Sequence, residues 1–316
     1  MSDEENQTRE SMARDKARQI LGSEPETFES PLTVLASPAW RGIEGDIWRA
    51  KTAESSIILK HYHADVDFYV DASAAINAAE QAGKTGVGPA LVHSWHDEGL
   101  AAFADLSYPW RAGGLHDAVD ATVRSNVISC KKSFQSDATL ENDACIFDEI
   151  ENLYEVARSG NAVTHNDAAV FLEFFRDAKD KLKSSGQDRV PCHRDGNTAN
   201  IMVGPDEAVL LVDFDLAANC DPFEDIGCYL IEFFESDAEA RGGFEEWYGH
   251  FDEGLFQRSM LYGLADDMRW GLIAAIMAVQ SRRNSLEFSK YSAWRFMRLE
   301  TQAKRSEAND RIRISA

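Results

Sequence analysis

The sequence predicts an α+β chain with two lobes: a small β-rich N-terminal lobe with one helix, then a larger, mainly helical C-terminal lobe. Apolar stretches typical of strands dominate the sequence up to about residue 106, and helical periodicity dominates the sequence after that residue. We therefore expect a mobile N-terminal tail over residues 1–25, a β-rich lobe over 26–106 and a helical lobe over 107–316.

In the β-rich lobe we expect strands over residues 32–59, with a turn at WRGIEG (40–45) between two of them. SIILKHY (56–62) predicts a strand with Lys60 near its end. An Ala-rich helix follows from Asp71, its expected N-cap, to Ala82. GVGPALVHSW and LAAFADLS predict further strands, and the tail leads into a short helix over Ala13–Leu21.

The helical lobe is indicated by apolar residues that recur on one face of each expected helix. This pattern is present over residues 141–157 and again over 171–182, and serines and a glycine at 184–186 stop the second helix. Residues 223–296 are again predicted to be helical. The chain contains no internal repeat.

The composition of the chain limits which classes of partner it can bind. The 316 residues carry a formal net charge of −22, so we expect neither nucleic acid nor an anionic membrane as a partner. The spacing of the five cysteines predicts neither a metal site nor a disulfide framework, and we expect no signal peptide in the polar N-terminal segment. The longest apolar stretch, 272–279, is too short to span a bilayer. We expect a soluble cytoplasmic protein that acts on a small molecule; its oligomeric state is not predicted.

The most informative segment is HRDGNTANIMVGPDEAVLLVDFD, residues 193–215. It predicts a loop carrying Asp195 and Asn200, a short hairpin, an apolar strand, and Asp213 at that strand's end. Asn200 follows Asp195 by 5 residues and Asp213 follows it by 18. These are the His-Arg-Asp…Asn and Asp-Phe-X signatures of phosphoryl transfer from ATP, in the expected order.

The chemistry assigns a role to each of these groups. Asp195 is the candidate catalytic base, which accepts a hydrogen bond from the attacking hydroxyl. Asn200 and Asp213 offer oxygen ligands to Mg²⁺, a hard ion. Asp215 is a further candidate metal ligand or substrate contact, or else a solvated turn residue. His193 and Arg194 are expected to hold the shape of the loop.

These residues resemble the kinase-like small-molecule phosphotransferases, the group that includes choline/ethanolamine kinases and aminoglycoside phosphotransferases. The resemblance covers roughly residues 32–300 and is closer to the choline kinase branch. It is carried there by Asp-Phe-Asp at 213–215, by Asn219, Pro222, Asp225, Ile226 and Gly227, and by DDMRWGL at 266–272. It implies a protein-kinase-like fold, with ATP and Mg²⁺ as cofactors. Asp225 would support the catalytic loop.

Protein kinases share the catalytic-loop signature, but this sequence departs from theirs. Asp-Phe-Asp stands in place of Asp-Phe-Gly, and no activation segment follows. Instead DPFEDIG arrives within ten residues of Asp213. A protein kinase is therefore not expected.

By the same resemblance, Lys60 would contact the α- and β-phosphates of ATP. Its usual partner is a glutamate on the next helix, but residues 72–75 contain none. Asp71 and Glu80 flank that region, and either is a possible partner. Gly42 and Gly45 would allow close approach to phosphates, or they form only a hairpin turn.

Acidic and aromatic residues are frequent in the segment after the Asp-Phe-Asp motif, where we expect the substrate to bind. Residues 221–267 contain 13 Asp and Glu against two Arg. Carboxylates and aromatic faces attract an ammonium group, which makes four residues possible substrate contacts: Trp247, Tyr248, Asp266 and Trp270. The alternative is that the aromatic side chains pack in the core while the acids face water.

Three hypotheses follow. The first is an ATP- and Mg²⁺-dependent kinase of a choline- or ethanolamine-like hydroxyl compound. The second is a kinase of the same fold that acts on an aminoglycoside, a sugar or an amino alcohol. The third is a non-catalytic, nucleotide-binding regulator, against which the intact Asp195, Asn200 and Asp213 argue.

Overall fold

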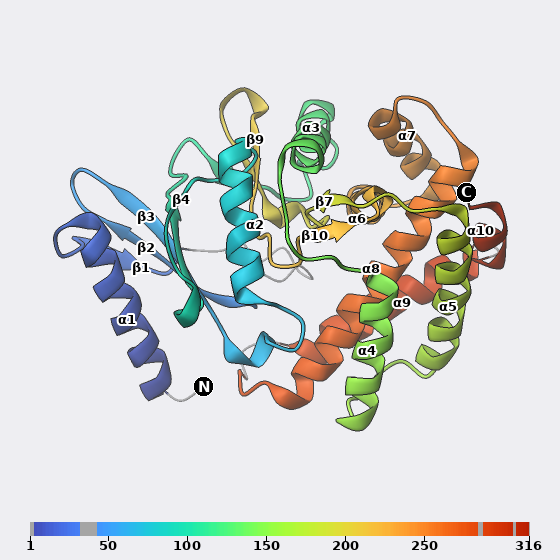
Figure 1. Cartoon of the computed structure of the whole chain (residues 1–316), viewed down its shortest axis with the longest axis horizontal. Helices are drawn as coiled ribbons and strands as arrows, with labels where there is room; N and C mark the ends of the chain where they lie inside the picture. Colours follow the sequence, from blue (N-terminus) through green and yellow to red (C-terminus); the bar gives the residue numbers. More distant parts are fainter. Residues whose placement is uncertain (1–2, 32–42, 284–286, 306–307, 316) are drawn as a thin grey trace. The chain divides into compact units, whose positions relative to one another are not determined.

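The computed structural model describes residues 3–31, 43–283, 287–305 and 308–315. The chain divides into two compact units, one made of Met1–Leu140 with Ala199–Ala217 and the other of Glu141–Thr198 with Ala218–Ala316. The first is rich in strands and the second is mainly helical, which confirms the predicted α+β fold class (Figure 1). These boundaries differ from the expected lobes.

A five-stranded antiparallel sheet forms the centre of the first unit. Its strand order is β1-β2-β3-β5-β4. The strands are β1 (Thr27–Glu29), β2 (Gly45–Lys51), β3 (Ser56–Tyr62), β4 (Leu91–Trp95) and β5 (Leu100–Ala104). The predicted strand at 56–62 is confirmed to the residue. Lys60 lies opposite Ile47 on β2 and Ala101 on β5, in the middle of the sheet.

Alternation along β3 separates two environments. Successive side chains of a strand point to opposite faces of its sheet. Ile57 and Leu59 join a buried apolar cluster on one face, whereas Ile58, Lys60 and Tyr62 line a pocket on the other. The strand that carries the candidate lysine therefore has apolar side chains on its outer face, whereas its inner face carries the polar side chains of Lys60 and Tyr62.

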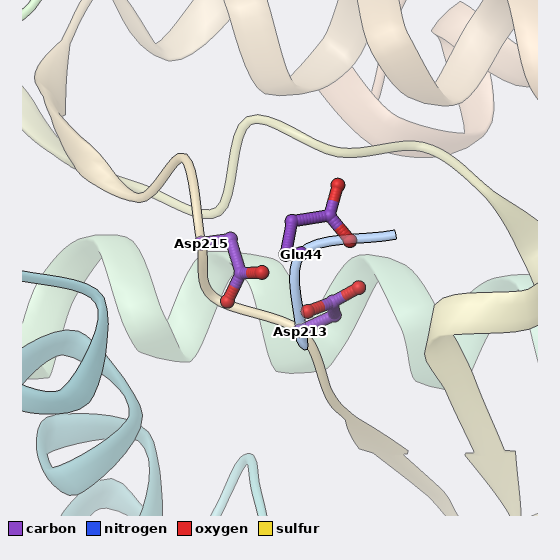
Figure 2. A group of neighbouring side chains, drawn as sticks. All are labelled: Glu44, Asp213 and Asp215. Atoms are coloured by element: carbon purple, nitrogen blue, oxygen red, sulfur yellow. The ribbon is translucent and has the colours of Figure 1, made fainter. Parts of the chain in front are cut away.

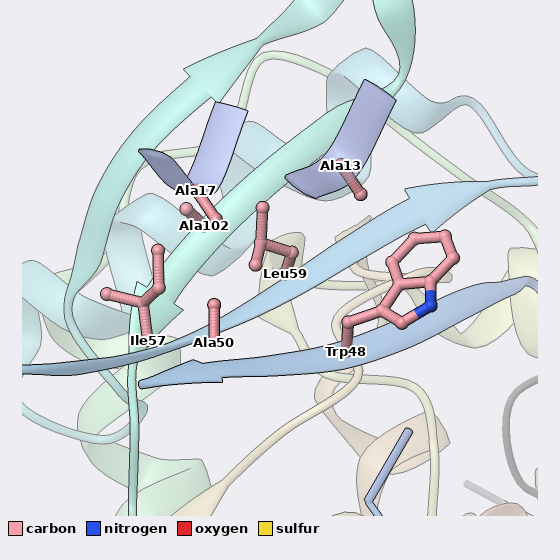
Figure 3. Packing of buried hydrophobic residues seen from close by; sticks show 7 residues of the cluster. All are labelled: Ala13, Ala17, Trp48, Ala50, Ile57, Leu59 and Ala102. Carbon is pink, nitrogen blue, oxygen red and sulfur yellow. The ribbon is translucent and has the colours of Figure 1, made fainter. Parts of the chain in front are cut away.

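Helix α1 (Asp3–Leu21) covers the outer face of this sheet (Figures 1 and 3). Ala13 and Ala17 are fully buried against Trp48 and Leu59, and the small alanine side chains let the helix approach the strands closely. We expected a mobile tail over residues 1–25. The structure instead has a helix that begins at Asp3 and packs into the core.

Helix α2 (Ala72–Thr85) begins where the sequence predicted. The side chain of Asp71 accepts hydrogen bonds from the backbone N–H groups of Ser73 and Ala74, and Gly86 ends the helix in the left-handed conformation. Helix α3 (Ala121–Asp137) was not predicted. It packs on a small sheet of β6 (Arg111–Ala112), β8 (Ile201–Val203) and β9 (Val209–Leu211), in the order β6-β8-β9.

The pairing of β6 with β8 explains the unit boundaries. This ladder joins the 201–211 hairpin to the first unit, although its sequence lies beyond residue 107. The expected lobes at 26–106 and 107–316 therefore differ from the observed units.

The second unit is built around α8, whose 28 residues are mostly buried. Its contacts include α4, α6 and α9. The helices are α4 (Ile146–Ser159), α5 (Ala168–Ser185), α6 (Pro222–Phe233), α7 (Asp237–Tyr248), α8 (Glu253–Gln280), α9 (Phe288–Arg305) and α10 (Ala308–Ile314). A two-stranded ladder of β7 (Val190–Cys192) and β10 (Ala218–Cys220) frames the segment that follows β7. Among the described helices, none has the length and apolar character needed to cross a membrane.

Candidate functional site

The inner face of the five-stranded sheet lines a cavity of about 320 Å³ in the first unit. Apolar side chains, Ile47, Ile58 and Phe103 among them, form part of its wall. Lys60 also lines the cavity, together with three polar residues that flank the β8–β9 hairpin in sequence: Asn200 before it, and Asp213 and Asp215 after it. The structure thus brings the candidate lysine and the three candidate metal ligands to one cavity.

Lys60 is buried and paired with two carboxylates. Its ammonium donates a hydrogen bond to Asp213 Oδ1 and another, of 2.5 Å, to Asp215 Oδ2. Burial alone lowers the pKa of a lysine, but the charges of Asp213 and Asp215 outweigh it and raise the pKa of Lys60 well above its usual value. Lys60 is therefore held firmly in its charged form.

The expected partners of Lys60, Asp71 and Glu80, are both corrected by the structure. Asp71 is engaged in capping α2, and Glu80 forms an exposed ion pair of 2.9 Å with Lys84 one turn along the helix. The carboxylates that meet Lys60 come instead from the segment that follows β9. Such a contact joins residues 153 apart in sequence, so local spacing cannot reveal it.

Asp215 is not the solvated turn residue considered as an alternative. Its side chain is only 6% exposed, and Tyr62 donates a 2.7 Å hydrogen bond to its Oδ1 while Lys60 occupies Oδ2. Burial raises the pKa of Asp215 well above its usual value, and the nearby charge of Asp213 adds to this effect. Asp215 is thus a buried carboxylate whose two oxygens have fixed partners.

Glu44 lies beside these two aspartates, although no sequence pattern marked it as a candidate site residue. Ligand oxygens of Glu44, Asp213 and Asp215 lie within 4.8 Å of one another (Figure 2). Tyr69 donates a 3.1 Å hydrogen bond to Glu44 Oε1. Burial and the neighbouring charge of Asp213 together raise the pKa of Glu44 from its usual value to about 7.

The donor set of this cluster fits Mg²⁺. The three residues offer carboxylate oxygens, which this ion prefers, and Asn200 on the same cavity offers an amide oxygen. Oxygens bound to one Mg²⁺ lie at most about 4.2 Å apart, because each is about 2.1 Å from the ion. The observed spacing therefore requires only small side-chain adjustments.

Two residues of the predicted motif have unusual backbone geometry. Arg194 and Asp213 have φ values of 65° and 69°, the left-handed region that non-glycine residues rarely adopt. Such conformations cost about 1–3 kcal/mol and persist only where surrounding contacts impose them. Arg194 directly precedes the candidate base Asp195, and Asp213 is itself a candidate metal ligand, so both unusual conformations lie within the predicted motif.

In the second unit, the loop after β7 carries Asp195. Asp225, fully buried, accepts hydrogen bonds of 3.2 and 2.8 Å from the backbone N–H groups of His193 and Arg194. The Asp195 carboxylate accepts a 2.6 Å hydrogen bond from the N–H of Asn197, and its backbone carbonyl lies 3.0 Å from His193 Nδ1. The carboxylate is thus oriented by the backbone of its own loop.

The Arg194 side chain anchors this loop in a buried ion network. Its guanidinium donates 2.7 Å hydrogen bonds to Glu224 and Glu149. Arg269 reaches the same two carboxylates and also donates a 2.9 Å hydrogen bond to the Arg194 carbonyl. The charges of Glu149 and Glu224 overcome the effect of burial and keep the pKa of Arg194 well above its usual value.

Gly196 is required by close packing. A Cβ at this position would lie 2.0 Å from the carbonyl oxygen of Cys228 on α6. Because no other residue type lacks a Cβ, only glycine lets the loop contact α6 at this distance. The loop that carries Asp195 is therefore fixed by a backbone-to-backbone contact as well as by charge.

Two of the four expected substrate contacts are corrected. Asp266 is 2% exposed and pairs with Arg269 at 2.6 Å, and Trp247 is 2% exposed and packs on Tyr229. Neither side chain reaches the surface in this structure. Tyr248 is 38% exposed and stacks on Phe244, and Trp270 is partly buried on α8.

Of the two candidate phosphate-loop glycines, Gly42 and Gly45, the structure describes only Gly45. Gly42 lies outside the described residues. Gly45 begins β2, and a Cβ there would lie 2.6 Å from the His61 carbonyl oxygen, so this position is restricted by the neighbouring strand. Its closeness to β3 is a packing requirement, in line with the hairpin alternative.

Comparisons with known proteins agree with this architecture. The sequence model of the phosphotransferase enzyme family matches residues 36–260. A choline/ethanolamine kinase family protein from Mesorhizobium loti superposes with a TM-score of 0.75 at 17% identity, over 95% of this chain and 98% of that one. Choline kinase LicA from Streptococcus pneumoniae gives 0.70 at 14% identity, over 93% and 99% of the chains.

Spectinomycin phosphotransferase, crystallised with ADP and spectinomycin, gives a TM-score of 0.59 at 12% identity, over 90% of this chain and 93% of that one. At these identities the likeness concerns the fold. A comparison with the curated proteins found no match.

The raised pKa of Glu44 predicts a pH-dependent stability. The folded protein keeps the Glu44 proton up to about pH 7, whereas the unfolded chain releases it near 4.5, so wild-type stability falls as pH rises through this window. In EDTA, we expect Glu44→Gln to gain up to about 3 kcal/mol over wild type between pH 4.5 and 7, measured by urea denaturation. The exposed Glu245→Gln should track wild type; a Glu44→Gln difference independent of pH would contradict the assignment.

The contact of Gly196 predicts that Gly196→Ala lowers the free energy of unfolding by about 1–3 kcal/mol, because the new methyl group must displace α6 or the loop. Gly242→Ala on α7 is the matched control. Nothing lies within 4 Å of its Cβ position, so it should leave stability unchanged or raise it by up to about 1 kcal/mol. Equal denaturation midpoints for the two variants would refute the packing argument.

Proposed function

Because the chain belongs to the phosphotransferase enzyme family and is a small-molecule kinase, we propose that it transfers the γ-phosphoryl group of ATP to a hydroxyl of a small cationic alcohol, with Mg²⁺ as the metal. The observation that carries this proposal is the set of Lys60, Asn200 and Asp213 on one cavity of the strand-rich unit. A buried ammonium and oxygen ligands on a partly apolar cavity suit a nucleotide triphosphate and its metal.

The cavity supports a division of labour within the nucleotide site. Its apolar wall, which includes Ile47, Ile58 and Phe103, suits the base, and Lys60 supplies positive charge to the phosphates. Asn200, Asp213 and Asp215 would hold Mg²⁺, with Glu44 as an additional carboxylate. When bound, the metal supplies charge neutralisation at the phosphate oxygens.

In this proposal Lys60 changes partners during the cycle. Without nucleotide it neutralises Asp213 and Asp215, and with nucleotide it would donate to the phosphates while those carboxylates face the metal. The lysine thus offsets part of the negative charge of these carboxylates before the nucleotide arrives. This removes part of the free-energy cost of leaving several buried carboxylates uncompensated.

Asp195 is proposed to orient the acceptor. Its carboxylate would accept a hydrogen bond from the substrate hydroxyl and receive that proton as the oxygen–phosphorus bond forms. The loop contacts to Asp225, Arg194 and Gly196 would hold Asp195 in place, so that little conformational freedom remains to be lost on reaction. Positioning and electrostatics would supply most of the rate acceleration.

A cationic acceptor is supported by charge and by resemblance. The chain carries a net charge of −22, which attracts cations, and its motifs are similar to those of the choline kinase branch. Fold relatives include proteins described as choline/ethanolamine kinases. Tyr248 remains an exposed aromatic surface on α7 for an ammonium group, whereas Trp247 and Asp266 no longer support this role.

The test measures ADP release with ATP and Mg²⁺ against choline, ethanolamine, amino alcohols, aminoglycosides and sugars. We expect turnover on choline or ethanolamine, and Asp195→Asn should lower kcat by about 10²–10⁴-fold, since it removes the base without changing size. Turnover only on other amino alcohols, aminoglycosides or sugars would assign the second substrate class. ATP binding without turnover on any compound would favour the regulator hypothesis and contradict this proposal.

A further inference from the structure

Helix α1 contacts the reverse side of the strands that form the proposed nucleotide site. Its residue Arg9 is largely buried, with 17% of its side chain exposed. The guanidinium donates 2.7 Å from Nε to Asp46 Oδ2 and 2.6 Å from Nη2 to the backbone carbonyl of His61. Asp46 and His61 are cross-strand partners on β2 and β3, so one side chain ties both strands together.

The two tied residues are sequence neighbours of the site. His61 follows Lys60 on β3, and Asp46 follows Glu44 by two residues. Alternation along a strand points His61 and Asp46 toward α1 while their neighbours Lys60 and Ile47 face the cavity. Arg9 therefore lies directly behind the residues that carry the lysine and the additional carboxylate.

The turn that leads into β2 is held from several sides. His63 contributes its N–H to the Glu44 carbonyl at 2.8 Å and places its ring nitrogen Nε2 3.4 Å from Asp46 Oδ1. Tyr69 holds the Glu44 side chain. Burial opposes ionisation of Asp46, but hydrogen bonds from His63 and Arg9 lower its pKa to about 2, so it stays charged at neutral pH.

We propose that Arg9 is a positioning residue for the nucleotide and metal site, so that the N-terminal helix forms part of the catalytic apparatus. This inference rests on the proposed function. By fixing Asp46 and the His61 carbonyl, Arg9 sets where Glu44 and Lys60 stand relative to Asp213 and Asp215. A misplacement of these groups would weaken binding of Mg²⁺ and ATP before it altered the acceptor site.

The same helix offers a matched control. Lys16 is also 17% exposed and forms a 2.5 Å ion pair with Glu98, which is 34% exposed against 31% for Asp46. Glu98 lies in the turn between β4 and β5, and it does not line the cavity. Loss of this pair loosens the docking of α1 without removing a contact to Asp46 or His61.

The experiment compares Arg9→Gln, Arg9→Lys and Lys16→Gln. For Arg9→Gln we expect the KM for ATP and the Kd for Mg·ATP to rise about tenfold, because a charge-assisted bridge is lost, with a smaller change in the acceptor KM. Arg9→Lys should be intermediate, since an ammonium lacks the fork needed to hold both partners. Lys16→Gln should change these constants by less than about twofold. It should nevertheless lower Tm by about as much as Arg9→Gln does.

A readout without nucleotide completes the test. Amide hydrogen exchange of metal-free protein should increase in peptides covering 43–50 and 57–63 for Arg9→Gln but not for Lys16→Gln. Equal KM shifts in both variants, or an unchanged KM and exchange in Arg9→Gln, would overturn the inference while leaving the kinase proposal intact. Wild-type protein that binds no Mg·ATP would refute the proposed function and this inference with it.

Discussion

The burial of a charged lysine beneath a sheet constrains the whole strand-rich unit. An ammonium removed from water is stable only where anions and hydrogen bonds replace its hydration. Lys60 obtains these from Asp213 and Asp215, more than 150 residues later in the chain. The segment that follows the β8–β9 hairpin must therefore come to lie beside β3 for Lys60 to find its carboxylate partners, and β6 pairs with that hairpin within the same unit.

Carboxylates outnumber the lysine in this cluster, so the cluster carries an excess of negative charge. Three acids lie close to one ammonium, and burial together with the charge of Asp213 raises the pKa of both Glu44 and Asp215. A divalent cation would relieve this excess of negative charge. The free energy stored in the unbalanced cluster is thus available to metal binding, at some cost to the stability of the metal-free protein.

In the second unit, too, a buried cation is stabilised by carboxylates, and here the pairing holds the shape of a loop. Arg194 is buried against Glu149 and Glu224, and the fully buried Asp225 accepts hydrogen bonds from backbone N–H groups of the loop. Removing one partner from such a network leaves an uncompensated charge, so each member restrains the others. The left-handed backbone at Arg194 persists because these contacts over-determine it.

Features governed by neighbouring residues could be predicted from the sequence. The strand at 56–62 follows from apolar and β-branched residues, and the Asp71 cap follows from its position before an Ala-rich segment. The motif spacing brought Asn200 and Asp213 to the same cavity because a hairpin of fixed length separates them.

Features that depend on distant residues could not be predicted. The partners of Lys60 and the presence of Glu44 arise from tertiary contacts, and no local pattern marks them. Asp266 looked available to a substrate because the sequence does not reveal the packing that buries α8, the helix that carries both Asp266 and its partner Arg269. Helix α1 uses alanines in its interface, which resemble an exposed surface when read without the sheet they contact.

In the proposed cycle, Lys60 competes with a metal for the same carboxylates and binds the nucleotide instead when the metal is present. Calorimetric titration of Lys60→Met with Mg²⁺ and, separately, with Mg·ATP would measure this competition. We expect tighter binding of Mg²⁺ than in wild type, because the competing ammonium is gone, together with binding of Mg·ATP weaker by about tenfold or more. Weaker binding of Mg²⁺ in the variant, or unchanged binding of Mg·ATP, would contradict it.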